Sequence, residues 1–175
     1  MALVAQLTLC EGLQRFTIEL SAGAALASVV RNLTDKVSSI DCFDLLSQHP
    51  DFAVRMAVAG MENLSIEAIG RLATDSSQSV VRQLLQSKAA RKRLRSSQVL
   101  TIAQRDPELA GAVADAVEDF SLDDEAVMAY LESYPDTHVR TKLAANPFTG
   151  NAVLRRLSNS DTDERVREIA MDMLA

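Results

Sequence analysis

The sequence contains nearly the same stretch twice, 85 residues apart. Residues 49–60 read HPDFAVRMAVAG and residues 134–145 read YPDTHVRTKLAA. Residues 49–82 align with residues 134–167 without a gap, and the alignment matches Pro50 with Pro135, Asp51 with Asp136, Val54 and Arg55 with Val139 and Arg140, Arg71 and Leu72 with Arg156 and Leu157, and Val81 and Arg82 with Val166 and Arg167. An internal repeat of this kind restricts the chain to folds that stack copies of one structural unit.

The Val of this repeat recurs along most of the chain. Val or Leu fills the position at intervals of 24 to 30 residues, and Arg follows it in every copy except at Ala110: the copies are Val30, Val54, Val81, Leu109, Val139 and Val166. Periods in this range indicate a solenoid. Within a copy, apolar residues follow the i, i+3, i+4 spacing of a helix twice, at 54–58 and again at 66–73. Few residues are aromatic and none is Trp, so the sequence predicts an all-α fold, an α-solenoid of about five to six short helix pairs.

Polar residues mark where these helices should begin. We expect helix starts at Asp106 with Pro107, Pro135 with Asp136, Ser121 with Asp124, and Asp161 with Glu164, because side-chain oxygens accept hydrogen bonds from the free N–H groups of a first turn.

Asp also precedes Arg by four residues in three copies, as Asp51 and Arg55, Asp136 and Arg140, and Asp163 and Arg167. This spacing permits an ion pair of about 0.3 to 0.5 kcal/mol along one helix, and more if the guanidinium bridges to the adjacent unit. The Arg residues are then expected to stack as a ladder.

The stretch VRTKLAANPFTGNAVLRRLSNSDTDERVR resembles one unit of the leucine-rich repeat variant family, a group of bacterial helical repeats related in architecture to HEAT repeats. The resemblance is good at 54–82 and 139–167 and weaker at 30–54, and it implies a right-handed superhelix. It is poor at 82–139, so we expect an irregular section around 83–133. One branch of the family carries an iron–sulfur cluster on about four Cys, whereas this chain has two, and we expect no cofactor.

The two ends of the chain complete the predicted organisation, a single domain over 1–175. Apolar residues at 3, 7, 10, 13, 16 and 20 predict a capping helix within 1–22, with repeats over 23–175. At the other end Ile169, Met173 and Leu174 lack a following helix to shield them, which is compatible with a natural cap, a self-associating end or a trimmed chain.

Composition favours a cytoplasmic protein. The sequence shows no secretory signal and no apolar run of about 18 residues that could span a membrane. Cys10 and Cys42 form no CxxC pair, which suits reduced, inert thiols. The net charge of −6 disfavours general binding to nucleic acid or to anionic membranes.

A basic segment is the first candidate for partner binding. In KAARKRLR, Lys88, Arg91, Lys92 and Arg95 have the spacing that places four cations on one helical face, and Arg93 adds a fifth. The segment is either a docking patch for an anionic partner or a solvated helix end, where cations are favoured by the helix dipole.

An acidic segment is the second candidate. Residues 106–136 hold ten carboxylates and no Lys or Arg, and the possible contacts are Asp119, Asp123, Asp124 and Glu125. A partner with a basic face would suit this segment. Alternatively, carboxylates such as Asp115, Asp123 and Asp124 lie near helix starts, where negative charge is stabilising.

The sequence shows no catalytic chemistry. His49 and His138 form no metal-binding spacing, and no GxSxG, GxxxxGK, GxGxxG or HExxH motif occurs. We therefore expect a non-catalytic interaction module that binds a protein or peptide in the groove of a helical array. The alternative is a nucleic-acid-binding protein resembling HEAT-like DNA glycosylases, acting through residues 88–95.

Overall fold

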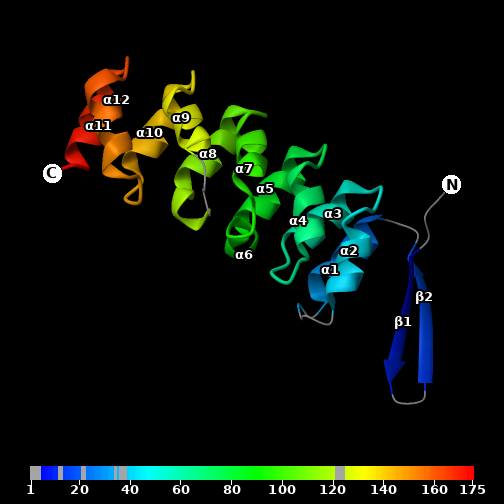
Figure 1. The fold of residues 1–175 in the computed structure, drawn as a ribbon. Coiled ribbons are helices and arrows are strands. Elements are labelled where there is room, and N and C mark those ends of the chain that lie inside the picture. Colours follow the sequence, from blue (N-terminus) through cyan, green and yellow to red (C-terminus); the bar gives the residue numbers. More distant parts are fainter. Residues whose placement is uncertain (1–4, 12–13, 21–22, 34, 36–38, 121–124) are drawn as a thin grey trace. The chain divides into compact units, whose positions relative to one another are not determined.

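The computed structural model describes residues 5–11, 14–20, 23–33, 35, 39–120 and 125–175, the first two ranges by their backbone alone (Figure 1). The chain divides into two compact units, Met1–Ser87 and Lys88–Ala175, where the sequence suggests one domain. The boundary falls directly before the basic segment.

The N-terminal segment is a β-hairpin, so the prediction of a capping helix within 1–22 is wrong. Strands β1 (Ala5–Glu11) and β2 (Gln14–Leu20) pair antiparallel, with Ala5 opposite Leu20 and Glu11 opposite Gln14 (Figure 1). The physical reason is visible in AQLTLCE and QRFTIEL, where apolar and polar residues alternate with the period of a strand. Thr8, Thr17 and Ile18 are β-branched and favour the extended backbone.

From Gly23 onward, every regular element that the structure describes is helical, as the all-α prediction requires. The first unit holds five of these helices: α1 (Gly23–Asn32), α2 (Ile40–Leu46), α3 (Phe52–Ala59), α4 (Ile66–Ala73) and α5 (Gln78–Gln86). Helix α3 packs against α1 and α5, while α2 packs against α4. Alternate helices therefore fall into two layers, with α1, α3 and α5 in the first layer and α2 and α4 in the second.

The second unit repeats this arrangement with two additions. Its elements are α6 (Lys88–Arg91), α7 (Ser96–Ala103), α8 (Pro107–Asp115), the 3₁₀ turn η2 (Val117–Asp119), α9 (Ala126–Glu132), α10 (Thr137–Ala145), α11 (Asn151–Ser160) and α12 (Glu164–Asp172). Helix α10 packs against α8 and α12, which form the first layer of this unit. Helix α9 packs against α7 and α11 in the second layer. The short helix α6 and the turn η2 both lie in the range 83–133, where the repeat pattern of the sequence fades.

The recurring Val position is buried in both units, as the repeat predicts. All six of its residues are 0% exposed, and each lies on one of the helices α1, α3, α5, α8, α10 and α12: Val30, Val54, Val81, Leu109, Val139 and Val166. Burial of each such side chain contributes about 1.5 to 3 kcal/mol. Ala110, which replaces Arg after Leu109, is itself fully buried on α8.

Helix starts follow the predicted chemistry at most positions. Asp106 accepts a hydrogen bond from the Leu109 N–H at the start of α8, with Pro107 as the first helical residue. Asp136 accepts one from the His138 N–H at the start of α10. The last helix begins at Glu164, and its N-cap is Asp163 instead of the predicted Asp161, since the Asp163 carboxylate accepts a hydrogen bond from the Arg165 N–H. The predicted start at Ser121 with Asp124 lies outside the described residues.

Candidate functional site

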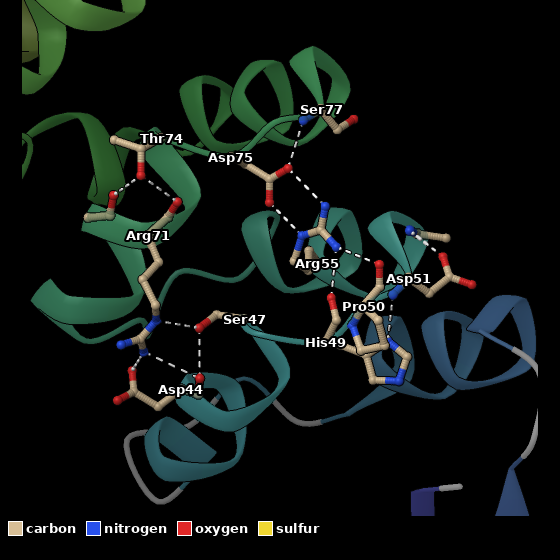
Figure 2. Close-up of polar contacts among 12 residues, drawn as sticks. Asp44, Ser47, His49, Pro50, Asp51, Arg55, Arg71, Thr74, Asp75 and Ser77 are labelled. Carbon is tan, nitrogen blue, oxygen red and sulfur yellow. Dashed lines mark hydrogen bonds and ion pairs between the residues drawn. The ribbon is translucent and has the colours of Figure 1, made fainter. Parts of the chain in front are cut away.

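Arg55 on α3 holds the start of α5 in a bidentate clamp. Its Nε and Nη2 donate to the Asp75 carboxylate at 2.5 and 3.0 Å (Figure 2). Its Nη1 donates to the carbonyl oxygens of His49 and Pro50 at 2.7 and 2.9 Å. Asp75 also accepts from the Ser77 N–H at 2.8 Å, so one buried carboxylate joins α3 to the turn that precedes α5. The hydrogen bond to Asp75 raises the pKa of Arg55 above its ordinary value.

Arg140 on α10 makes the same clamp in the second unit. Its Nε and Nη2 donate to Asp161 at 2.8 and 3.1 Å, and its Nη1 donates to the carbonyl oxygens of Tyr134 and Pro135 at 2.6 and 3.1 Å. The side chains of Arg140 and Asp161 are 9% and 2% exposed. Burial alone would raise the pKa of Asp161, but hydrogen bonds from Arg140 and the Asp163 N–H hold it below the ordinary value. Arg167 then donates to the Asp161 carbonyl at 2.8 Å, which extends the chain of contacts into α12.

The predicted ion pairs within one helix are replaced by these longer connections. In Asp51, Asp136 and Asp163, a side-chain oxygen accepts a hydrogen bond from the backbone N–H two residues ahead. That hydrogen bond directs each carboxylate to its own helix start. Arg55 and Arg140 instead reach a carboxylate in the turn before the next helix of the same layer, within their own copy of the repeat. Arg82 on α5 is exposed.

A second matched Arg links the helices of the other layer. Arg71 on α4 donates to the Ser47 hydroxyl at 3.0 Å and lies 3.1 Å from the Asp44 carboxylate of α2 (Figure 2). Its counterpart Arg156 on α11 binds Glu132 of α9 through two hydrogen bonds of 2.8 and 2.6 Å. At two of the three matched Arg positions, Arg55 with Arg140 and Arg71 with Arg156, the side chains therefore hold neighbouring elements together. At the third, Arg167 donates to the Asp161 carbonyl, whereas Arg82 is exposed.

The basic segment does not form one cationic helical face, so that prediction is wrong. Helix α6 ends at Arg91, and Leu94 turns into the core with 2% exposure. Arg95 is the N-cap residue of α7, where its N–H donates to the Gln98 side chain at 2.9 Å. Lys92, Arg93 and Arg95 are exposed. The burial of Leu94 thus separates Arg95 from the cations of α6.

The other two cations of the segment bind an acidic candidate. Arg91 donates to the Asp119 carboxylate at 3.0 and 2.6 Å, and the Lys88 Nζ lies 3.1 Å from its second oxygen. The hydrogen bond from Arg91, assisted by Lys88, holds the pKa of Asp119 below its ordinary value. The basic and acidic segments therefore neutralise each other in part.

Most carboxylates of the acidic segment that the structure describes also have structural partners. Asp106 and Asp136 cap α8 and α10, and Glu132 binds Arg156. Asp115 is the last residue of α8 and binds Lys142, so its predicted place at a helix start is wrong. Glu125 is exposed at the start of α9, while Asp123 and Asp124 lie outside the described residues.

Where the repeat lacks its Arg, at Ala110, a different set of contacts joins α8 to α10. The side chain of Lys142 passes over Gly111, so a Cβ on Gly111 would contact the side-chain carbons of Lys142. The Lys142 Nζ lies 2.5 Å from the Asp115 carboxylate. Asn146 donates to the Ala114 carbonyl at 3.0 Å. Gly inside a helix is unfavourable, and the passage of the Lys142 side chain explains this one.

Beside these contacts lies a hollow of about 330 Å³, which we name the α8–α10 hollow; its lining includes Asp115, Glu118, Thr141, Lys142, Asn146 and Phe148. A hollow of about 340 Å³ in the first unit is lined in part by Met56 and Ala57 of α3 and by Gly60 and Met61, the two residues that follow it. These four positions match Thr141, Lys142, Ala145 and Asn146 in the repeat alignment. The repeat therefore places a hollow beside the same helix end in each unit. Sequence reasoning missed both, because spacing within one helix does not reveal gaps between neighbours.

Among the residues that the structure describes, no three His, Cys, Asp or Glu side chains gather to hold a metal ion. None of the described helices has the length and hydropathy of a membrane span. Cys42 is a free, exposed cysteine whose thiol pKa is raised by the partial burial of its sulfur. The side chain of Cys10 is outside the described residues.

Comparisons with protein-family models, with curated proteins and with solved structures found no match.

Proposed function

We propose that the chain is a non-catalytic interaction module, built as a right-handed α-solenoid of the type that the leucine-rich repeat variant resemblance implies. The observation that carries the proposal is the repeated clamp: Arg55 with Asp75 and Arg140 with Asp161 each tie one first-layer helix to the turn before the next. Such links serve a regular array, in which each unit is stabilised by its neighbours.

The core of the array supports the same proposal. The repeat position is fully buried in three helices of each unit, and alternate helices pack together within each unit. The conspicuous polar side chains are used to connect helices: Arg, Asp and Asn residues bind helix starts, carbonyls and one another. A fold that uses its polar side chains to fix helices against one another offers a partner a rigid surface.

The alternative, a nucleic-acid-binding protein that acts through residues 88–95, gains no support from these contacts. Lys88 and Arg91 are directed to Asp119. Lys92, Arg93 and Arg95 are exposed but do not lie on one helical face with them. Affinity for a duplex depends on the number of phosphates that cations neutralise. A chain with net charge −6 and so short a basic surface is a poor match for a duplex.

A competition experiment tests the proposal. The immobilised chain is incubated with lysate of its source cells, and free chain is added to displace whatever is retained. We expect a protein to be retained in a fixed ratio and released by free chain. Retention of chaperones alone would contradict the proposal. So would tight duplex DNA binding that weakens steeply with salt and is lost on Lys92→Glu with Arg95→Glu, a pair of exposed changes that spare the Arg91 contact.

A further inference from the structure

The loop after α10 presents an aromatic ring to solvent on a fixed backbone. Two buried side chains hold the loop: Asn146 accepts a hydrogen bond from the Phe148 N–H at 2.9 Å, and the Thr149 hydroxyl donates to the Leu143 carbonyl at 2.6 Å. Phe148 is nevertheless 66% exposed at the edge of the α8–α10 hollow. Aromatic side chains, Phe among them, are enriched in protein–protein interfaces relative to the rest of the surface.

The charge of the α8–α10 hollow is set by one carboxylate. Lys142 pairs with Asp115 and cancels its charge. Glu118 is exposed and lies 3.4 Å from the Asn146 amide, and among the described residues no cation pairs with it. Asp119, the next residue, is already bound by Lys88 and Arg91. The hollow thus combines an uncompensated negative charge with an exposed aromatic ring.

We propose that the α8–α10 hollow binds an arginine side chain from a partner protein, with the guanidinium stacked on Phe148 and hydrogen-bonded to Glu118. This inference rests on the proposed interaction function and names the chemistry of the partner. A guanidinium satisfies both features at once, because it is attracted to an aromatic face and its planar N–H groups match a carboxylate. A carboxylate or phosphate in the hollow would be repelled by Glu118. A neutral side chain would leave that charge without a partner.

Amide NMR shifts test the assignment with two capped tripeptides, Gly-Arg-Gly and Gly-Gln-Gly. We expect the arginine peptide to shift the amide signals of Thr141, Phe148 and Thr149 saturably, with a Kd in the millimolar range and weaker binding at high salt. Glu118→Gln and Phe148→Ala should each raise the Kd roughly three- to tenfold, the size of effect typical of such contacts. Both side chains are exposed, so circular dichroism should show folded variants.

Matched controls lie in the first unit. Glu67→Gln on α4 and Phe52→Ala on α3 make the same chemical changes at exposed positions that do not line the hollow, and each should leave the Kd unchanged. No saturable shift with the arginine peptide, an equal response to the glutamine peptide, or an equal loss in the control variants would overturn the proposal.

Failure of this inference can be separated from failure of the proposed function. If a retained protein partner binds the Glu118→Gln and Phe148→Ala variants as well as it binds the unchanged chain, the hollow is the wrong surface while the interaction function stands. If the arginine peptide binds as expected and no protein is retained, the interaction function is wrong while the chemistry of the hollow holds.

Discussion

Replacing Arg140 with Ala should remove a large part of the stability of the second unit. The change leaves the Asp161 carboxylate, whose side chain is 2% exposed, without its two guanidinium hydrogen bonds. It also removes the donor to the Tyr134 and Pro135 carbonyls. Breaking a buried ion pair by removing one partner typically costs about 3 to 5 kcal/mol. That is a large share of the roughly 5 to 15 kcal/mol that stabilises a folded domain.

Urea unfolding followed by circular dichroism measures this loss, and hydrogen exchange of the α12 amides locates it. The matched control is Arg156→Ala, which removes an Arg–carboxylate pair of 2.6 Å in which the Arg side chain is 57% exposed and Glu132 is 14% exposed. Solvent around the guanidinium screens this pair, so the control should lower the urea midpoint much less than Arg140→Ala does. Equal losses in the two variants would refute the reasoning, because burial would then have no influence on the clamp.

Three further outcomes are expected. The pKa values of Asp119 and Asp161 are lowered in the folded chain, so their stabilising contribution is present above the unfolded value of about 3.9 and is lost as pH falls through the folded values. Between about pH 5 and pH 2, the urea midpoint should therefore fall further in the unchanged chain than in Asp119→Asn. Leu109→Ala, at a fully buried position, should cost about 2 to 5 kcal/mol by urea unfolding, whereas Leu45→Ala, at 73% exposure, should change stability by less than about 0.5 kcal/mol. Asp163→Ala removes the hydrogen bond to the Arg165 N–H and should cost about 0.5 to 2 kcal/mol, with faster hydrogen exchange in the first turn of α12.

The helices were predictable where burial and capping leave a local signal. Val54 and Val139 mark the buried face because a helix must place the same type of residue against its neighbour in each copy. Asp106 marks a helix start because its carboxylate accepts a hydrogen bond from an N–H three residues ahead. The N-terminal hairpin was missed because a short apolar pattern spaced by three and four residues competed with the alternation of QLTLCE, and only the alternation matches the strands.

The partners of the matched Arg residues were not predictable from spacing alone. Asp75 and Asp161 both bind the matched Arg of their copy. In the gap-free alignment, however, Asp75 aligns with residue 160, one position before Asp161. An alignment that allowed a one-residue shift in the turn would have matched them. The partner of Arg91 was hidden for a different reason: Asp119 is 28 residues ahead, and only the packing of α6 near η2 brings the two side chains together.

The central claim is that Arg55 and Arg140 each join their own helix to the turn before the next helix of the same layer. Proton–proton contacts from the Arg side-chain Nε–H groups, observed by NMR, test it most directly. The account predicts contacts from Arg55 to Asp75 and from Arg140 to Asp161, 20 and 21 residues away, with both Nε–H groups protected from exchange with water. Contacts to Asp51 and Asp136 on their own helices instead, or Nε–H groups that exchange freely, would contradict it.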